Sequence, residues 1–298
     1  AIRDQIAQPL GMDVEEAAAG MYRVINANMA HGVRQITVRR GLDPREFPMV
    51  VAGGAGALHA CMIAEELEIP ALLVPATASI LCAMGMIFSD LQHDFVRSRI
   101  GPLSQIPPSE LKGLIEDMAL EGENQLVLEG ISRDQMAHQV TLDLRYLKQY
   151  HEVTLPVSWD SAVRADVGAI AAAFHREHNR LYGYDLAGEG TELELINVRV
   201  RALGRTEKPS LPKVPEGTAD PAGALKGFRQ AFVPEEAAFA SVPVYDGHRL
   251  LAGNEIAGPA LVERRDTTIF LSAGFAARID DHATCFLGRK EQDAGRQD

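Results

Sequence analysis

A glycine-rich turn between two apolar segments is the feature that most constrains how this chain can fold. Residues 49–52 form a short, wholly apolar run, a Gly-Gly-Ala-Gly turn occupies 53–56, and an alanine-rich segment follows over 57–67. This pattern predicts a buried strand, a turn with almost no side chains, and a helix. A second apolar run at 71–74 predicts another strand. Strand, helix and strand in such close succession indicate a βαβ unit, which requires neighbouring parallel strands.

The turn is suited to an electron-rich or flat ligand. The first amides of a helix and its dipole favour a phosphate or a similar group, and the missing side chains let a flat ligand lie directly on the backbone. The residues alone leave two interpretations of this turn open. Gly53, Gly54, Ala55 and Gly56 either contact a nucleotide or merely let the helix pack close to the sheet.

Spacing excludes two familiar phosphate-binding fingerprints. The dinucleotide fingerprint requires a third glycine where His59 stands, and an acid at the end of the next strand, where Val74 and Pro75 stand. A P-loop requires Gly-Lys-Ser/Thr, which the sequence does not contain.

A long helix is predicted to precede the turn. Asp13 and Glu16 have the spacing of a capping box, which marks a helix start. Asn28 falls on the apolar stripe of this helix, so we expect it either to be buried and hydrogen-bonded to a neighbouring segment or to contact a ligand. The stripe expected to face the core consists of Ala17, Met21, Val24, Ile25, Gly32 and Ile36.

Beyond a proline-rich boundary at 101–108, the sequence predicts two further regions, which gives domains 1–100, 101–205 and 206–298. In the last, Asp246-Gly247 predicts a hairpin turn between strands at 242–245 and 249–251, and the polar tail from Arg289 is predicted to be disordered. The middle domain is predicted to contain a helix over 109–129, a hairpin of strands at 140–146 and 153–157, a helix over 163–182, and a strand over 193–203 with a bulge at Ile196.

Two groups of potential metal ligands attract attention. Asp90, His93 and Asp94 would share one face of a helix, and His175 and His178 have i, i+3 spacing. For the first group we favour solvated surface residues. For the histidine pair, which lacks a third ligand, we favour ring packing and hydrogen bonds, so the sequence predicts no metal site.

Composition limits the possible partners and compartment. A formal net charge of −12 argues against nucleic acid or an anionic membrane as the main partner. No apolar run approaches the roughly 18–20 residues of a membrane span. Three cysteines without metal-ligand spacing indicate reduced thiols in a cytoplasmic protein. The first residues lack an initiator Met and resemble the middle of a helix, so we expect a piece of a longer protein.

Short motifs along almost the whole chain have distinctive residues and follow one another in a distinctive order. They lie at 26–29, 40–45, 53–60, 66–70, 83–85, 89–97, 181–184, 243–245 and 258–263. Together they resemble the hydantoinase A/5-oxoprolinase family, which includes ATP-dependent hydantoinases and 5-oxoprolinases and the ATP-using subunits of acetone and acetophenone carboxylases.

The resemblance implies an α/β plus α+β fold: part of an actin/hexokinase-like ATPase lobe followed by a β-rich C-terminal domain. It assigns Gly53, Gly54, Ala55 and Gly56 to the adenosine side of ATP, with Asn28 and His59 as further possible site residues. ATP and Mg are the implied cofactors of the parent protein. The family's phosphate-binding turns and metal ligands match nothing here, so the chain alone is expected not to hydrolyse ATP, and its catalytic residues are unknown.

The implied parent enzyme hydrolyses cyclic amides, such as hydantoin or 5-oxoproline, with phosphorylation by ATP and with a hydantoinase B-type subunit or domain as partner. One alternative is the ATP-using subunit of an acetone/acetophenone-type carboxylase acting on a ketone, which residues 76–82 slightly favour. Another is a non-catalytic assembly module. A sugar- or acyl-kinase-like protein is disfavoured, because kinases are not expected to carry the long β-rich extension after Pro108.

Overall fold

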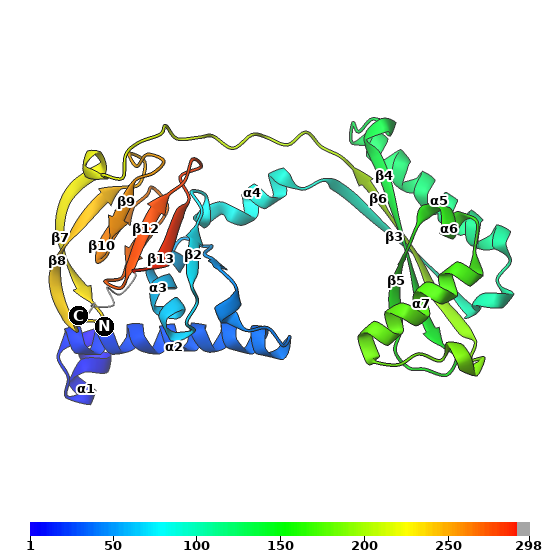
Figure 1. Cartoon of the computed structure of the whole chain (residues 1–298), viewed down its shortest axis with the longest axis horizontal. Helices are drawn as coiled ribbons and strands as arrows, with labels where there is room; N and C mark the ends of the chain where they lie inside the picture. The colour runs from blue at the N-terminus through cyan, green and yellow to red at the C-terminus, as the bar shows by residue number, and fades with distance from the viewer. Residues whose placement is uncertain (291–298) are drawn as a thin grey trace, which may run out of the picture. The chain divides into compact units, whose positions relative to one another are not determined.

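The computed structural model describes residues 1–290, which form two compact units (Figure 1). Unit 1 consists of Ala1–Ile87 and the chain from Ser210 onward, and unit 2 consists of Phe88–Pro209. Each unit has a hydrophobic core of its own. Most of the tail that the sequence predicts to be disordered, residues 291–298, lies outside the described residues.

The three domains expected from the sequence are distributed differently over these units. Strand β13 (Cys285–Arg289) pairs antiparallel with β2 (Ala71–Val74), so the end of the described chain completes a sheet that the N-terminal part begins. Most of the first and third expected domains therefore share unit 1, whereas residues 88–100 of the first belong to unit 2. The chain passes from one unit to the other after Ile87 and after Pro209, so the first division lies before the proline-rich segment 101–108.

The predicted βαβ unit is confirmed. Strand β1 (Met49–Val50) lies parallel to β2, and α3 (Gly56–Glu66) connects them. The first strand is shorter than expected: Val50 is 56% exposed, whereas Val51 turns into the core. This sheet has the strand order β1-β2-β13-β12-β9, with β12 at Phe275–Ile279 and β9 at Glu255–Ala257.

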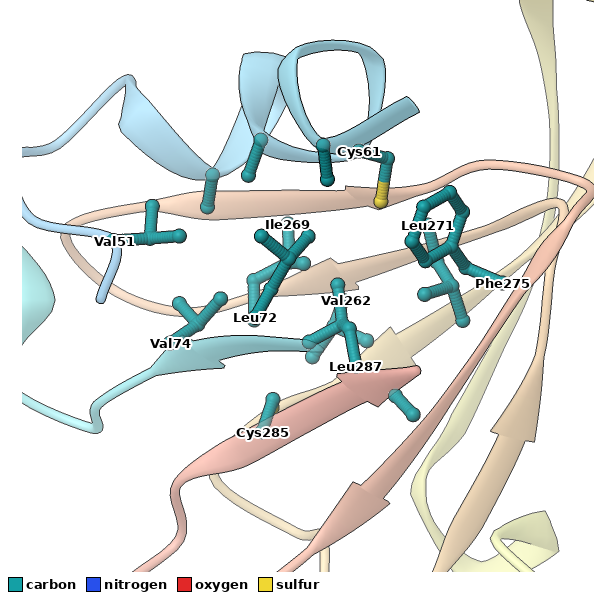
Figure 2. Packing of buried hydrophobic residues seen from close by; sticks show 14 of the residues in the cluster. Val51, Cys61, Leu72, Val74, Val262, Ile269, Leu271, Phe275, Cys285 and Leu287 are labelled. Carbon is teal, nitrogen blue, oxygen red and sulfur yellow. The ribbon is translucent and has the colours of Figure 1, made fainter. Parts of the chain in front are cut away.

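A second sheet of unit 1 has the order β11-β10-β8-β7. Its strands are β7 (Leu225–Val233), β8 (Ala238–Asp246), β10 (Ala260–Glu263) and β11 (Thr268–Leu271). Figure 2 shows apolar side chains from α3 and from both sheets meeting in one core, among them Leu72, Val262 and Leu287. The helix and the two sheets therefore stabilise one another through a shared apolar interior.

The prediction of a hairpin at Asp246-Gly247 is wrong. A turn does form there, since the Arg249 amide donates to the Asp246 carbonyl at 3.0 Å. However, β8 pairs antiparallel with β7 and parallel with β10, and residues 249–251 form no strand. Leu250 is buried in the core of unit 1 instead. The chain therefore leaves β8 and continues toward β9 in the first sheet.

Helix α2 (Val14–Arg39) begins as predicted, because Asp13 Oδ1 accepts a hydrogen bond from the Glu16 amide at 2.7 Å. The expected core-facing stripe is largely wrong, since most of its large side chains, such as Val24 and Ile36, lie exposed. The helix buries a face of small residues, which permits close approach to α3. That buried face consists of Ala17, Ala19, Asn26 and Ala30. Shorter helical segments include the π-helix Arg3–Ala7, α1 (Gln8–Leu10) and α4 (Leu81–Phe88), which begins in unit 1. Single 3-10 turns lie at Pro44–Glu46, Ala78–Ile80 and Ala222–Ala224.

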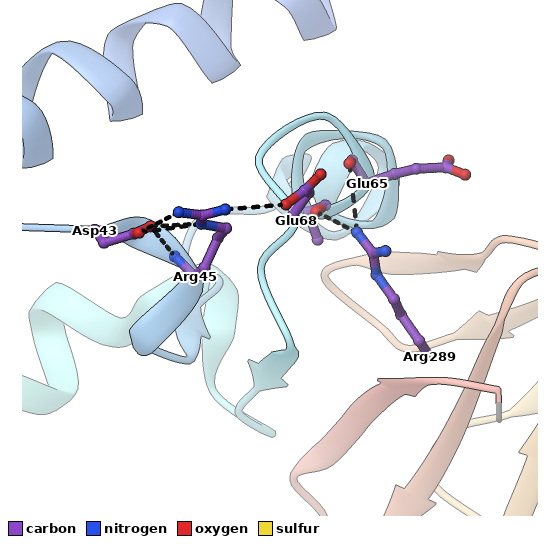
Figure 3. A network of polar contacts seen from close by, with 6 residues as sticks. Asp43, Arg45, Glu65, Glu68 and Arg289 are labelled. Carbon is purple, nitrogen blue, oxygen red and sulfur yellow. Dashed lines mark hydrogen bonds and ion pairs between the residues drawn. The ribbon is translucent and has the colours of Figure 1, made fainter.

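The C-terminal end of α3 is held by polar contacts (Figure 3). Arg289, the last residue of β13, donates to the backbone carbonyls of Ala64 and Glu65 at 3.2 and 3.4 Å. A cation at this end also complements the negative pole of the helix dipole. Beside it, Arg45 pairs with Asp43 at 2.7 Å.

Unit 2 is an antiparallel sheet with helices, as the sequence predicts. Its strand order is β3-β6-β4-β5, and apolar side chains of the sheet pack against α5, α6 and α7. The strands are β3 (Leu91–Pro102), β4 (Met136–Tyr146), β5 (Val153–Val157) and β6 (Leu193–Gly204). The helices are α5 (Pro108–Leu128), α6 (Trp159–Val163) and α7 (Val167–Tyr182).

Two details of this unit follow from side-chain size and spacing. The bulge predicted at Ile196 is confirmed, since Asn197 lies opposite Asp143 whereas Leu195 lies opposite Leu144. Helix α5 approaches β6 so closely that a methyl group placed at Gly122 would lie 2.4 Å from Ala202 Cβ.

Candidate functional site

The glycine turn leaves β1 and leads into α3 at one end of the parallel strand pair. Gly53 has a φ of +95°, which residues with a side chain rarely adopt, and its amide donates to the Ala78 carbonyl at 2.7 Å. At Gly56 a methyl group would lie 3.2 Å from Val51 Cγ1. Gly53, Gly54 and Ala55 are exposed, so the turn is open to a ligand on its outer side.

The local chemistry fits an electron-rich group. Ala55 is the N-cap of α3 and supplies no side-chain hydrogen bond to the first amides of the helix, of which those of Gly56 and Leu58 donate to the Gly53 and Ala55 carbonyls at 3.3 and 3.1 Å. The turn also lies at the carboxyl end of β1, and the loop after β2 lies beside it. Ligands of α/β sheets bind at this end of parallel strands.

The loop between β10 and β11 lies against the same turn, and sequence reasoning missed it. The Thr267 hydroxyl donates to the Gly54 carbonyl at 2.8 Å, across 213 residues of sequence. The Ser79 hydroxyl donates to the Asp266 carboxylate, and Arg264 donates to the Pro75 carbonyl at 2.9 Å. The only sequence signal nearby is the family-like segment 258–263, which stops just before these residues.

His59 and Asn28, the other candidate residues, have different surroundings. His59 Nδ1 lies 2.9 Å from Asn26 Oδ1, and its ring stacks on Tyr22. Burial lowers the pKa of the His59 imidazole. Asn28 is exposed, so a buried position for it is wrong. Asn26 is the buried amide instead, because α2 turns its face of small residues toward α3.

An apolar cavity lies beside His59 in unit 1. Its volume is about 430 Å³. The Tyr22 hydroxyl donates to the Leu58 carbonyl at 2.6 Å at its edge, and burial raises the pKa of this phenol to about 12. The cavity is lined by Val14, Ala18, Leu58, Phe232, Phe239 and Phe270, among others.

The potential metal ligands at 90–94 make ion pairs with other side chains. Asp90, His93 and Asp94 lie on or just before a strand rather than on a helix, so the assumption of one shared helix face is wrong. Asp94 pairs with Arg201 at 2.7 Å, and His93 pairs with Glu129 at 2.9 Å. Within residues 1–290, no group of three or more His, Cys, Asp or Glu side chains is placed to hold a metal ion.

The two histidines of α7 make structural contacts. His175 Nδ1 lies 2.7 Å from the Tyr146 hydroxyl, and His178 Nδ1 lies 2.9 Å from the Tyr184 carbonyl. The His178 ring is buried among Tyr146, Phe174 and Tyr184. These contacts agree with the packing role that the sequence favours for both residues.

The unit 2 sheet face that carries Asp143 is polar and contains a buried charge. Asp143 is 2% exposed, and its carboxylate accepts hydrogen bonds from Thr154, Asn197 and Arg199 at 2.8–2.9 Å. Burial by itself raises the pKa of this carboxyl, but the hydrogen bonds from Arg199, Asn197 and Thr154 outweigh it, so the pKa lies below its usual value. The carboxylate therefore stays ionised and organises this face.

Family models match both parts of the chain. The model of the hydantoinase/oxoprolinase family matches residues 1–95, and that of the hydantoinase/oxoprolinase C-terminal domain matches residues 108–289. The chain is 32% identical over 287 residues to caprolactamase subunit alpha of Pseudomonas jessenii, covering 95% of this chain and 41% of that protein. It is 30% identical to the acetophenone carboxylase gamma subunit of Aromatoleum aromaticum, covering 96% of this chain and 40% of that subunit.

The fold also matches a solved structure. A nucleotide-free structure of acetone carboxylase superposes with a TM-score of 0.78 at 26% identity, covering 97% of this chain and 42% of that one. This match confirms the expected fold class, part of an actin/hexokinase-like ATPase lobe with a β-rich C-terminal region. The chain spans about two fifths of the length of the relatives described above. None of the helices within residues 1–290 has the length and apolarity needed to cross a membrane. The glycine turn, the βαβ unit and these matches together show that the chain belongs to the hydantoinase/oxoprolinase family.

Proposed function

We propose that this chain is the C-terminal part of an ATP-dependent subunit that hydrolyses cyclic amides such as hydantoin or 5-oxoproline, and that Gly53, Gly54, Ala55 and Gly56 contact the adenosine side of ATP. The observation that carries the proposal is the exposed glycine turn at the head of α3, whose first amides receive no side-chain cap. The relatives support the reaction class, because a caprolactamase described as ATP-dependent is among them.

Phosphorylation explains why such a reaction requires ATP. The carbonyl carbon of an amide is only weakly electrophilic. Transfer of the γ-phosphoryl group of ATP to the amide oxygen, with release of ADP, makes this carbon a better electrophile. Water then adds to the carbon, the bond from this carbon to the ring nitrogen breaks as the nitrogen takes up a proton, and hydrolysis of the acyl phosphate that remains releases phosphate. We propose that this chain supplies contacts to the nucleoside end of ATP; within residues 1–290, no group of three or more His, Cys, Asp or Glu side chains is placed to hold Mg. We therefore assign no step of the reaction to a metal within this chain, and we propose that the phosphate- and metal-binding groups belong to another part of the complete subunit.

Exposed apolar side chains on α1 and α2 support a larger assembly. Leu10, Met21, Val24 and Ile25 line an apolar groove of about 470 Å³ on unit 1. Contiguous apolar surface of this kind marks a surface that another body covers. We propose that this body is the part of the hydantoinase/oxoprolinase subunit that the chain does not span, and that a hydantoinase B-type subunit or domain completes the enzyme.

A carboxylase is the second candidate. The acetophenone carboxylase gamma subunit is nearly as similar as the caprolactamase, and the acetone carboxylase structure superposes closely. In that case ATP would phosphorylate an enol of the ketone and activate bicarbonate. Both candidates use the same proposed nucleotide contact, so the substrate distinguishes them.

Substrate-dependent ATP consumption tests the proposal. The complete subunit, prepared with its B-type partner, is incubated with hydantoin, 5-oxoproline, caprolactam, or acetone with bicarbonate, and phosphate release is compared with product formation. We expect phosphate release coupled to opening of a cyclic amide, and no hydrolysis of ATP by this chain alone. Coupling to ketone carboxylation instead would support the second candidate, whereas no coupling to any of these substrates would contradict both.

A pair of glycine variants tests the contact itself. Gly54→Leu places a bulky side chain on the exposed turn and is expected to weaken binding of ATP at least tenfold. Gly32→Ala on α2, where an added methyl group meets no atom within 4 Å, is the matched control and is expected to bind ATP normally. Equal affinity of the two variants would contradict the assignment of the turn.

A further inference from the structure

We propose that the loop between β10 and β11, residues 264–267, forms one wall of the nucleotide site, and that the Asp266 carboxylate accepts a hydrogen bond from the nucleoside of bound ATP. This inference rests on the proposed contact between ATP and the glycine turn. It extends that contact to residues that lie more than 200 positions later in the sequence.

Three segments are fixed to one another at this place. Thr267, which is 6% exposed, donates its hydroxyl hydrogen to the Gly54 carbonyl at 2.8 Å. The Gly53 amide donates to the Ala78 carbonyl at 2.7 Å, which ties the turn to the loop after β2. Arg264 donates to the Pro75 carbonyl in that same loop. The glycine turn, the loop after β2 and the β10–β11 loop therefore form one preorganised surface.

Asp266 lies at the exposed side of this surface. Its backbone carbonyl oxygen would lie 3.3 Å from a methyl group placed at Gly54, so the loop lies directly against the turn. Ser79, from the loop after β2, donates its hydroxyl hydrogen to Asp266 Oδ2. The Asp266 side chain therefore lies where the loop after β2 meets the β10–β11 loop. An exposed hydrogen-bond acceptor thus lies beside the turn.

The chemistry of a carboxylate determines which part of a nucleotide it can meet. An ionised carboxylate only accepts hydrogen bonds, and so do the phosphate oxygens of ATP, which also carry like charge. The nucleoside, by contrast, offers donors in its ribose hydroxyls and its adenine amino group. Asp266 is therefore expected to bind the nucleoside end of ATP on this side of the turn and to repel the phosphates, so that they lie farther from the β10–β11 loop.

Thr267 has a different role from Asp266. Its hydroxyl is committed to the Gly54 carbonyl, so it is a positioning residue that fixes the turn rather than a ligand contact. Replacing it with valine removes the hydroxyl with little change in volume, and replacing it with serine keeps the hydroxyl. Valine is expected to loosen the turn, and serine is expected to retain its order.

Binding of adenosine and of ATP to this chain, followed by NMR titration to millimolar ligand, tests the inference. Asp266→Asn and Asp266→Ala are expected to weaken binding of both ligands about tenfold with unchanged Tm, because the loss of a hydrogen bond to a charged group has this size. Glu236→Gln, which removes an exposed carboxylate from the turn between β7 and β8, is the control and is expected to bind as the unaltered chain does.

Two further arms identify the donor and the positioning role. If a ribose hydroxyl is the donor, 2′-deoxyadenosine binds the unaltered chain more weakly than adenosine does, whereas the two ligands bind the Asp266→Ala chain equally well. If the adenine amino group is the donor, inosine, which lacks that group, gives the same pair of results. Thr267→Val is expected to accelerate hydrogen exchange of the Gly53 amide, which donates to the Ala78 carbonyl, and Thr267→Ser is expected to restore its protection.

The outcomes separate the two proposals. If the unaltered chain binds adenosine but the Asp266 variants bind as tightly as Glu236→Gln, the role of the β10–β11 loop is wrong while the glycine-turn contact stands. If the unaltered chain binds neither adenosine nor ATP at millimolar concentration, the proposed turn contact is wrong and the inference with it.

Discussion

Gly122 lies where α5 packs closely against Ala202 of β6, and its replacement by alanine is expected to destabilise unit 2. In the interior of a helix, alanine is normally favoured over glycine by about 1 kcal/mol. Here the added methyl carbon would lie 2.4 Å from Ala202 Cβ and 3.0 Å from Phe95 Cε2, whereas carbon atoms in contact prefer roughly 3.5–4.0 Å. Overpacking of this severity costs about 3 kcal/mol. The net expectation is a loss of about 2 kcal/mol.

The protein offers a selective assay and a matched control. Trp159, the single tryptophan of the sequence, begins α6 in unit 2, so its fluorescence during urea denaturation reports on that unit. Gly113→Ala, in the same helix, meets no atom within 4 Å and is expected to raise the free energy of unfolding by up to about 1 kcal/mol. Combining Gly122→Ala with Ala202→Gly removes the closest clash and is expected to recover part of the loss.

Two results would refute this reasoning. One is a Gly122→Ala protein that is as stable as Gly113→Ala. The other is strict additivity in the double variant, because residues whose atoms collide must show a coupling energy. Either would mean that α5 moves away from β6 at little cost.

Three further predictions concern titration and stability. Asp143→Asn is expected to lower the stability of unit 2 by about 1–2 kcal/mol at pH 7. Because the pKa of Asp143 is lowered on folding, the unaltered protein is expected to lose stability more steeply than the variant as the pH falls below about 4, which acid titration of Trp159 fluorescence would measure. Tyr22→Phe is expected to remove the tyrosine that titrates near pH 12 from an ultraviolet absorbance titration and to destabilise unit 1 by about 1 kcal/mol, since the Leu58 carbonyl loses its donor. Burial raises the pKa of the Cys61 and Cys285 thiols to about 11, so a thiol reagent near pH 8 is expected to modify the exposed Cys82 quickly and the other two only on unfolding.

Local signals made much of the fold predictable. The run at 71–74 becomes β2 with the same bounds, and the Asp13 cap starts α2 where the spacing places it. The bulge at Ile196 also appears at the expected residue. In each case the physical cause lies within a few residues, as a side-chain periodicity or a hydrogen bond to a nearby amide, and sequence spacing reports it directly.

Contacts between distant segments were not predictable in this way. The apolar stripe of α2 satisfies helical periodicity, but periodicity does not say whether a neighbour within the described residues covers it. The partner of β8 depends on where Leu250 is buried, which the Asp-Gly turn does not reveal. At the candidate site, Gly53–Gly56 follows from the sequence, whereas Thr267 and Asp266 reach it only through the tertiary fold. The sequence also did not reveal that Asn26 rather than Asn28 is the buried asparagine, because the buried face of α2 depends on its neighbour α3.

The pairing of β13 with β2 has a consequence for biosynthesis. The edge of β2 that accepts β13 is made more than 200 residues before its partner, and at about 5–20 residues per second the ribosome needs roughly 10–40 s to deliver it. Unit 2 is continuous in sequence and can fold during that interval. Leu72 and its apolar neighbours lack the β13 side chains that pack on them until β13 has been made. A nascent chain stalled before Cys285 would therefore expose an unpaired strand and an open core, the two features that chaperones bind and that lead to aggregation.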